Sequence, residues 1–598
     1  MAASLAITLW AGGLSAQSTG VVSHETLLHI ESALQSGEIT PEEAILQKLY
    51  AGFQPEKVEA RFADDSGAPI KCMTPYLVEF EQIRDELPLQ TLRMGEALIE
   101  QAVPVHSESE YVHLSPSGNF ALYYQTTGDN AVPEEDSNGS GIPDYIERAA
   151  AMADSSWRYQ VETIGFHDFV LDEPYVIRFQ RTGYYGYTRQ TGGTTEIVIH
   201  NTFNGFPENN HREGNRYGAL YAALAHEIKH AIQYAANRWE GDAGRSDWME
   251  MDAVMMEEVV HPDVDDYYNY LMRYDRDNDD WDRNNTNSNS IFGSPHRGVP
   301  GSYYHATWML YFYEMYGIEF WRDVWDRIGE DWEKQQMSDE DTRKAYISFL
   351  EAVDQQLQSE FTTLASAHVL NHAWHASAGP LKSGFYFGFE DSDNYPNPAM
   401  EGIIDFPPDN LLSERASPMG ASYYSVIPSG VLLGQPSVRL QSENPGANMA
   451  MVGFFHDGSV DLLQISDPSS KGGVLQSTWK WGDLQEVLVV VVNNNRSQIA
   501  TYDLYVESVT PDEDMISNNY PNPFSQETRI NFSVNRAKHV KVEVFDGIGR
   551  KIQTVADQEF GAGFHSVDFD GNGLASGMYF YRIITDQAVI SNKMMLIR

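Results

Sequence analysis

The chain has very little cysteine, little positive charge and no long apolar run. Cys72 is the single cysteine among 598 residues, which excludes a disulfide within the chain. Lys and Arg total 40 against 86 Asp and Glu, a formal net charge of −46. This negative excess argues against binding nucleic acid or an anionic lipid surface. No transmembrane segment is expected, because a spanning helix needs about 18 or more apolar residues in a row.

Composition changes along the chain and predicts several domains. Residues 1–16 are mostly apolar and end in small residues, as a secretory signal peptide does, although the usual basic start is missing. Residues 17–106 are rich in helix-forming polar residues and carry no catalytic pattern, so we interpret them as a prosegment. A mixed α and β domain that carries the main sequence motifs is expected over 107–390. Alternating apolar and polar residues over 391–510 predict a β-sandwich accessory domain.

The most informative motif is HExxH, at His226-Glu227-Ile228-Lys229-His230, inside an alanine-rich run that favours helix. Residues i and i+4 of a helix lie on one face, about 5–6 Å apart, so the two imidazoles can bind one zinc ion. Glu227 can then face a zinc-bound water as its general base. Because the motif is short, a chance HExxH on a surface helix is the alternative.

A catalytic zinc needs a third protein ligand. Glu250 lies 20 residues after His230 on a second helical segment, a gap that allows the chain to turn back. A capping role is the alternative, because Asp247-x-x-Glu250 has the spacing of a capping box. The pattern resembles the gluzincin, or thermolysin-like, zinc metallopeptidases. That resemblance implies His226, His230 and Glu250 as zinc ligands, with Glu257 as a substitute ligand or as a residue that orients a ligand histidine.

Residues 136–147 fit the calcium-loop pattern D-x-N-x-S-G-x5-E. Calcium takes many oxygen ligands, and Gly141 supplies the sharp turn that such a loop needs. Pro143 is unusual in a paired EF-hand, and with it the loop is similar to the single calcium loops of secreted bacterial proteins. We therefore expect one structural Ca²⁺, the alternative being a polar turn into the next helix. The expected ligands are Asp136, Asn138, Ser140, the carbonyl of Ile142, Asp144 and Glu147.

An aromatic helix beginning near residue 303 offers a group to stabilise the oxyanion of a tetrahedral intermediate. Gluzincins use a Tyr or His there, because a preorganised donor stabilises the transition state. Tyr304 is the first candidate and His305 the second, with core packing as the alternative for both.

Cys72 lies in the segment interpreted as a prosegment, within Lys71-Cys72-Met73-Thr74-Pro75. A thiolate is an excellent zinc ligand. The segment is similar to the matrix-metallopeptidase cysteine switch in one feature, a Pro three residues after the Cys. The hypothesis is that Cys72 fills the open zinc position until the prosegment is removed. A small buried core residue is the alternative.

The segment 511–598 resembles the type A sorting domain of the type IX secretion system. The resemblance rests on Asn519-Tyr520-Pro521-Asn522-Pro523-Phe524, on the Gly-rich turns near 547 and 573, and on the final strand ending in Lys593-Met594-Met595-Leu596-Ile597-Arg598. It implies a small β-sandwich and export across the outer membrane by the type IX secretion machinery. An ordinary fibronectin-like module is the alternative.

These features predict a multidomain chain with an α+β zincin-like catalytic domain followed by two all-β sandwich domains. The expected function is that of a secreted zinc endopeptidase acting on protein or peptide substrates, with Zn²⁺ and Ca²⁺ as cofactors. One alternative is a surface adhesion or glycan-binding protein on an inactive zincin fold, which the intact Glu227 disfavours. Hydrolysis of a bond other than a peptide bond is a further alternative.

Overall fold

A computed structural model describes most of the chain. The described residues are 23–64, 68–102, 110–240, 246–271, 303, 306–337, 400–406, 412–416, 420–428, 435–465, 469–495, 498–509, 516–534, 537–547, 549–561, 563–585 and 589–597.

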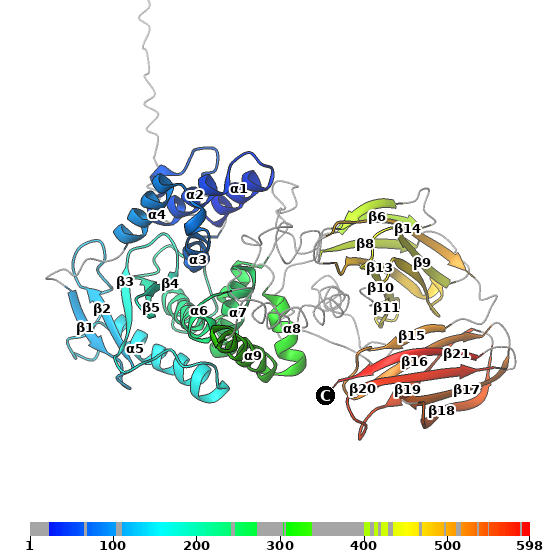
Figure 1. Ribbon diagram of the computed structural model, residues 1–598. Coiled ribbons are helices and arrows are strands. Elements are labelled where there is room, and N and C mark those ends of the chain that lie inside the picture. The colour runs from blue at the N-terminus through cyan, green and yellow to red at the C-terminus, as the bar shows by residue number, and fades with distance from the viewer. Residues whose placement is uncertain are drawn as a thin grey trace, which may run out of the picture. The chain divides into compact units, whose positions relative to one another are not determined.

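Four helices form the N-terminal part of the chain (Figure 1): α1 (His24–Gln35), α2 (Pro41–Phe53), α3 (Thr74–Gln82) and α4 (Leu89–Ala102). Helix α2 begins with a capping box between Thr40 and Glu43 and contacts the other three helices. Its buried Lys48 bonds to Glu31 at 3.0 Å and to Glu79 at 2.9 Å. Burial lowers the pKa of Lys48, but the two carboxylates outweigh burial, so the pKa is raised. Helices α1, α2 and α3 therefore share a buried, charged centre.

A five-stranded sheet follows, with the order β1-β2-β3-β5-β4. Its strands are β1 (Glu110–Leu114), β2 (Phe120–Gln125), β3 (Tyr175–Gln180), β4 (Gly186–Thr191) and β5 (Thr194–His200). Strands β2, β3 and β5 run parallel, and β4 is antiparallel to β5. Strand β5 is buried almost along its whole length, which suits its place inside the sheet. Strand β4 is left at the edge.

Residues 71–74, which we call the edge segment, lie beside β4. Cys72 pairs with Gly186 in a parallel bridge. The main-chain N–H of Met73 donates to the carbonyl of Gly186 at 3.2 Å, and the N–H of Tyr185 donates to the carbonyl of the segment's first residue at 3.2 Å. The edge segment thus adds main-chain pairing to the free side of β4, as an added strand would.

Helices carry the rest of this part of the chain: α5 (Asp144–Trp157), α6 (Asn215–Asn237), α7 (Ser246–Val260), α8 (Thr307–Tyr316) and α9 (Ile318–Met337). Helix α5 contacts β1 and β2. Helix α6 is rich in alanine, the strongest helix former, and is buried over most of its length. The side-chain amide of Gln233 donates to the carbonyl of Met249 at 3.1 Å and to Asp252 at 2.8 Å. These bonds hold α7 against the C-terminal half of α6.

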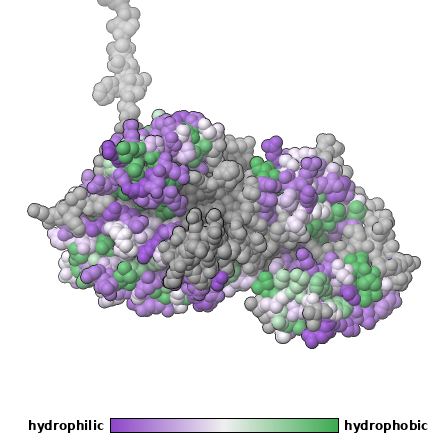
Figure 2. Space-filling model, in the orientation of Figure 1, coloured by the Kyte–Doolittle hydropathy of each residue, from purple (hydrophilic) through white to green (hydrophobic). Residues whose placement is uncertain are grey.

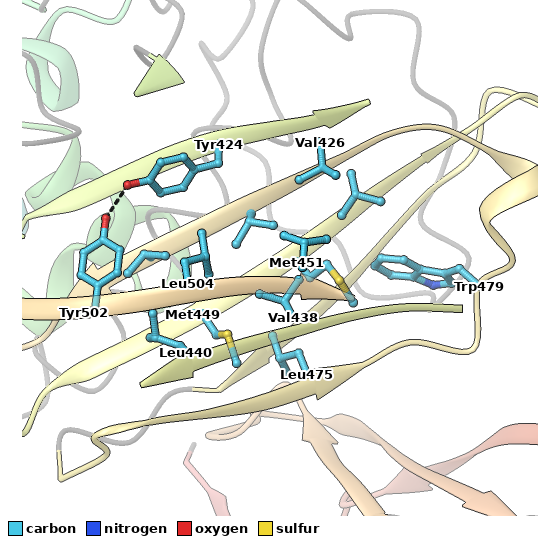
Figure 3. Close-up of a cluster of buried hydrophobic side chains, with 14 of the residues drawn as sticks. Tyr424, Val426, Val438, Leu440, Met449, Met451, Leu475, Trp479, Tyr502 and Leu504 are labelled. Carbon is cyan, nitrogen blue, oxygen red and sulfur yellow. Dashed lines mark hydrogen bonds between the residues drawn. The ribbon is translucent and has the colours of Figure 1, made fainter. Parts of the chain in front are cut away.

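Two sheets share one core between residues 400 and 509. Strands β6 (Met400–Phe406), β8 (Ala421–Pro428), β10 (Ala447–Phe455), β11 (Val460–Ile465) and β13 (Leu484–Asn493) form one sheet; β7 (Leu412–Ala416), β9 (Gln435–Ser442), β12 (Gly472–Gln476) and β14 (Ala500–Val509) form the other. Side chains of both sheets meet in this core (Figure 3), where the hydroxyls of Tyr424 and Tyr502 lie 2.6 Å apart. The two layers form a β-sandwich.

A second pair of sheets spans residues 516–596. One holds β15 (Ile516–Tyr520), β16 (Glu527–Val534) and β19 (Gly563–Asp570). The other holds β17 (Lys538–Asp546), β18 (Lys551–Phe560), β20 (Gly577–Ile584) and β21 (Val589–Leu596). Buried side chains from both sheets, among them Ile530 and Val542, make a separate core.

One face of the described surface can be seen in Figure 2. On the face shown in Figure 2, hydrophilic residues surround smaller hydrophobic patches, in keeping with the large negative charge. Among the described residues, no helix has the length and apolarity that crossing a membrane requires.

Candidate metal centre

Helix α6 presents His226, Glu227 and His230 in the interior of the protein. The two histidines are 1% and 0% exposed, and their rings lie at 81° to each other. Their Nε2 atoms lie 3.1 Å apart. Two nitrogens bound to one tetrahedral zinc at 2.0–2.1 Å would be about 3.3 Å apart. The histidine pair therefore has a spacing close to that of two ligands of one metal ion.

Two further donors meet the histidines. One ligand atom each from Cys72, His226, His230 and Glu250 lie within 4.8 Å of one another, and all four residues are buried. Two imidazoles, a thiol and a carboxylate are a donor set that suits zinc. The structure thus brings together the three predicted zinc ligands and the cysteine of the proposed switch. Glu250 is fully buried in this cluster, whereas a side chain that only caps a helix normally lies at its surface.

The carboxylate of Glu227 is held by hydroxyl groups. The hydroxyl of Thr188 lies 2.8 Å from Glu227 Oε2 and 2.9 Å from the Glu227 carbonyl oxygen. The hydroxyl of Thr74 lies 3.4 Å from the same Oε2 and accepts from the Thr188 N–H at 2.8 Å. A Cβ at Gly186 would come within 3.1 Å of Glu227 Oε1, so glycine leaves room for this carboxylate. Thr74 belongs to the edge segment, which therefore contacts the predicted base.

Cys72 is fully buried, and its sulfur is oriented by the next turn of the chain. The main-chain N–H of Thr74 donates to the sulfur at 3.3 Å, and the Thr74 hydroxyl lies 3.1 Å from it. Nearby, burial raises the pKa of Tyr184 well above its usual value, and the charges of Tyr187, Cys72 and Glu227 add to the shift. The tyrosine is therefore a neutral hydroxyl beside the cluster.

The first residue of the edge segment forms a buried ion pair. Lys71 Nζ lies 2.7 Å from Asp266 Oδ2, and the two side chains are 1% and 0% exposed. The hydroxyl of Tyr185 donates to Asp266 Oδ1 at 3.1 Å, and the ammonium lies 5.1 Å from the centre of the Tyr185 ring. Asp266 opens a short 3-10 helix (Asp266–Asn269) after α7.

The predicted calcium ligands lie in one exposed loop that leads into α5. Asp136 accepts from the main-chain N–H groups of Ser140 and Gly141 at 3.0 and 2.9 Å. The Asn138 amide donates to Glu147 at 2.7 Å. The Ser140 hydroxyl donates to the carbonyl of Ile142 at 3.3 Å, and Asp144 accepts from the Ser137 N–H at 3.0 Å. All six predicted calcium ligands thus lie in one short stretch of chain, where their side chains and main chain bond to one another.

Three predicted site residues remain: Glu257, Tyr304 and His305. Glu257 is buried on α7, two turns after Glu250. Tyr304 and His305, the candidates for the oxyanion, lie outside the described residues.

Four residues of this region were not predicted from the sequence: Thr74, Thr188, Tyr185 and Asp266. Their contacts join segments far apart in the chain, and no spacing within the sequence reveals such contacts. The one available signal was local: Thr74 stands two residues from Cys72, at a spacing that lets its hydroxyl reach the sulfur.

Comparison with known proteins identifies the C-terminal part. Residues 518–597 match a family described as a secretion system C-terminal sorting domain. The protein is therefore exported by the type IX secretion system to the cell surface or the outside. The prediction of a sorting domain is thereby confirmed. No curated protein matches the chain.

Several solved structures show a slight likeness to the chain. They include a β-1,2-glucanase from Parabacteroides distasonis, with 12% identity over 32% of this chain and 33% of that chain and a TM-score of 0.14. They also include a β-glucuronidase from Ruminococcus gnavus, with 13% identity over 30% of this chain and 36% of that chain and a TM-score of 0.11. The chain spans about a third of the length of these structures. Likeness at such TM-scores carries no inference about fold or activity.

Proposed function

We propose that the protein is a secreted zinc endopeptidase, with His226, His230 and Glu250 as zinc ligands and Glu227 as general base. The observation that carries the proposal is the convergence of these three donors in a buried cluster beside the Glu227 carboxylate, which the Thr188 hydroxyl orients. Zinc in this cluster would polarise a scissile carbonyl and lower the pKa of a bound water to about 7. Glu227 would accept the proton of the attacking water and pass it to the leaving amine.

In the full chain this site is covered by the edge segment, and we propose that Cys72 keeps the enzyme latent. Its thiol lies with the three predicted zinc ligands, so it would fill the position that a catalytic zinc keeps open for water or substrate. Thr74 contacts the predicted base, and the main chain beside Cys72 pairs with the edge of β4. Removal of the N-terminal helices together with the edge segment would free the zinc position, the predicted base and the edge of β4.

The test uses full-length protein with a protease site introduced between α4 and β1, compared before and after the cut. We expect casein hydrolysis to rise after the cut in wild type and to fall at least a hundredfold in Glu227→Gln at equal bound zinc. Glu240→Gln, which removes an exposed carboxylate just beyond α6, is the matched control. Activity retained by Glu227→Gln would refute the role of the base. A folded, zinc-loaded wild type that hydrolyses no protein after the cut would favour a binding protein.

We further propose that the loop 136–147 binds one structural Ca²⁺. Its support is the sequence pattern of carboxylate, amide and hydroxyl side chains around the turn at Gly141, which bond to one another within the loop. Calcium added to metal-depleted protein should raise the thermal midpoint of wild type. It should have little effect on Asp136→Asn, whereas the neighbouring variant Glu135→Gln should respond like wild type. Equal responses of all three proteins would place the calcium elsewhere.

A further inference from the structure

The Lys71 ammonium is buried against the carboxylate of Asp266 and lies near the ring of Tyr185. We call the space that this ammonium fills the lysine pocket. Lys71 reaches it from a main chain paired with edge strand β4, one residue before the cysteine of the metal cluster. An extended chain bound along β4 with one residue at the cluster would therefore direct a neighbouring side chain toward Asp266.

We infer that this pocket selects a substrate with a lysine side chain next to the scissile bond, and that Lys71 occupies it in the full chain. This inference rests on the proposed endopeptidase function. Asp266 would then determine the specificity for this side chain, and Tyr185 would position the Asp266 carboxylate.

Charge balance is the first reason. Asp266 is fully buried, and its ammonium partner belongs to the segment that would leave on maturation. Departure of Lys71 would remove a charge-assisted hydrogen bond from Asp266, and a new cation would restore it. The face of the Tyr185 ring adds a second attraction for a positive group. After maturation, the pocket would thus favour a cationic substrate side chain over a neutral one.

Hydrogen-bond geometry favours lysine over arginine. Asp266 Oδ1 accepts from the Tyr185 hydroxyl, so Oδ2 is the oxygen that meets the cation. A guanidinium binds a carboxylate best through two parallel bonds to both oxygens, whereas an ammonium binds well as a point charge to one. The observed contact of 2.7 Å between the ammonium and Oδ2 is of the second kind.

The test measures kcat/KM of the cut protein on three matched peptides that differ at one residue: lysine, norleucine or arginine. Two sets place this residue on either side of the cleaved bond. We expect wild type to prefer lysine over norleucine by at least about tenfold, or 1.4 kcal/mol. In Asp266→Asn the ratio should fall toward one, and in Tyr185→Phe the preference for lysine over arginine should shrink. Each comparison is a ratio of kcat/KM values for two peptides on the same variant, so a general loss of activity affects both values equally and does not change the ratio.

A binding measurement gives a readout independent of turnover. Fluorescence anisotropy of the lysine and norleucine peptides on cut Glu227→Gln protein should show the same preference, and adding Asp266→Asn should remove it. Peptides cleaved without lysine preference, or bound equally with and without Asp266, would overturn the pocket and leave the proposed function standing. Lysine-selective binding by a folded, zinc-loaded protein that cleaves nothing would support the pocket and refute the endopeptidase.

Discussion

Replacing Lys71 with methionine should loosen the edge segment from β4. The substitution keeps an unbranched side chain of similar length but leaves the buried Asp266 carboxylate without its ammonium. Removing one partner of a buried ion pair typically costs about 3–5 kcal/mol. If the pair holds the segment in place, local opening becomes easier by that amount, which corresponds to a factor of about a hundred to several thousand.

Hydrogen exchange of individual amides measures this opening directly. The N–H groups of Met73 and Tyr185 bond across the junction between the segment and β4, so both should exchange faster in Lys71→Met by that factor. Amides between β2 and β3 should keep their rates and serve as the internal control. Lys71→Met combined with Asp266→Asn removes both charges and should recover much of the protection. Unchanged exchange at both junction amides in Lys71→Met would refute this reasoning.

Three further predictions concern the surrounding structure. Burial, followed by the charge of Arg181, lowers the pKa of His200 to about 3. Because the histidine of the unfolded chain gains its proton near pH 6.5, the folded protein should lose about 2 kcal/mol of stability between pH 7 and pH 5. Over the same pH range, the thermal midpoint of His200→Asn should fall less than that of wild type. Gly186→Ala places a Cβ 2.7 Å from a main-chain carbonyl oxygen, so overpacking should cost about 1–3 kcal/mol and lower the thermal midpoint. Gly193→Ala, whose Cβ would meet open space, is the control. Equal midpoints of the two variants would contradict steric strain at Gly186. Tyr424→Phe should cost the sandwich about 1–3 kcal/mol in urea unfolding, and a second Tyr→Phe change at its partner hydroxyl should add less than the first.

Local patterns allowed the sequence to predict parts of the candidate centre. The histidines four residues apart lie together because the period of a helix is fixed by its own main chain. Alanines around them made the helix itself predictable. The turn at Gly141 likewise follows from the residues within one loop. In each case the residues that decide the geometry are within a few positions of one another.

Long-range contacts could not be predicted in this way. Lys71 and Asp266 are 195 residues apart, and no spacing rule relates them. Pairing of Cys72 with Gly186 depends on which strand of the sheet remains at the edge, and this follows from the strand order rather than from either residue. For Glu250, the sequence left a zinc ligand and a helix cap as alternatives. Its burial with two histidines favours the ligand, which stays a prediction until metal is measured.

Attachment of the edge segment to the rest of the chain affects how completely the segment covers the site. A segment joined covalently to its site can meet it at an effective concentration near the millimolar range. Contacts too weak to hold a separate peptide can therefore keep the site covered in every molecule, however dilute the protein. One cut between α4 and β1 turns the same contacts into a bimolecular equilibrium. Export into a large external volume would then drive dissociation by dilution alone.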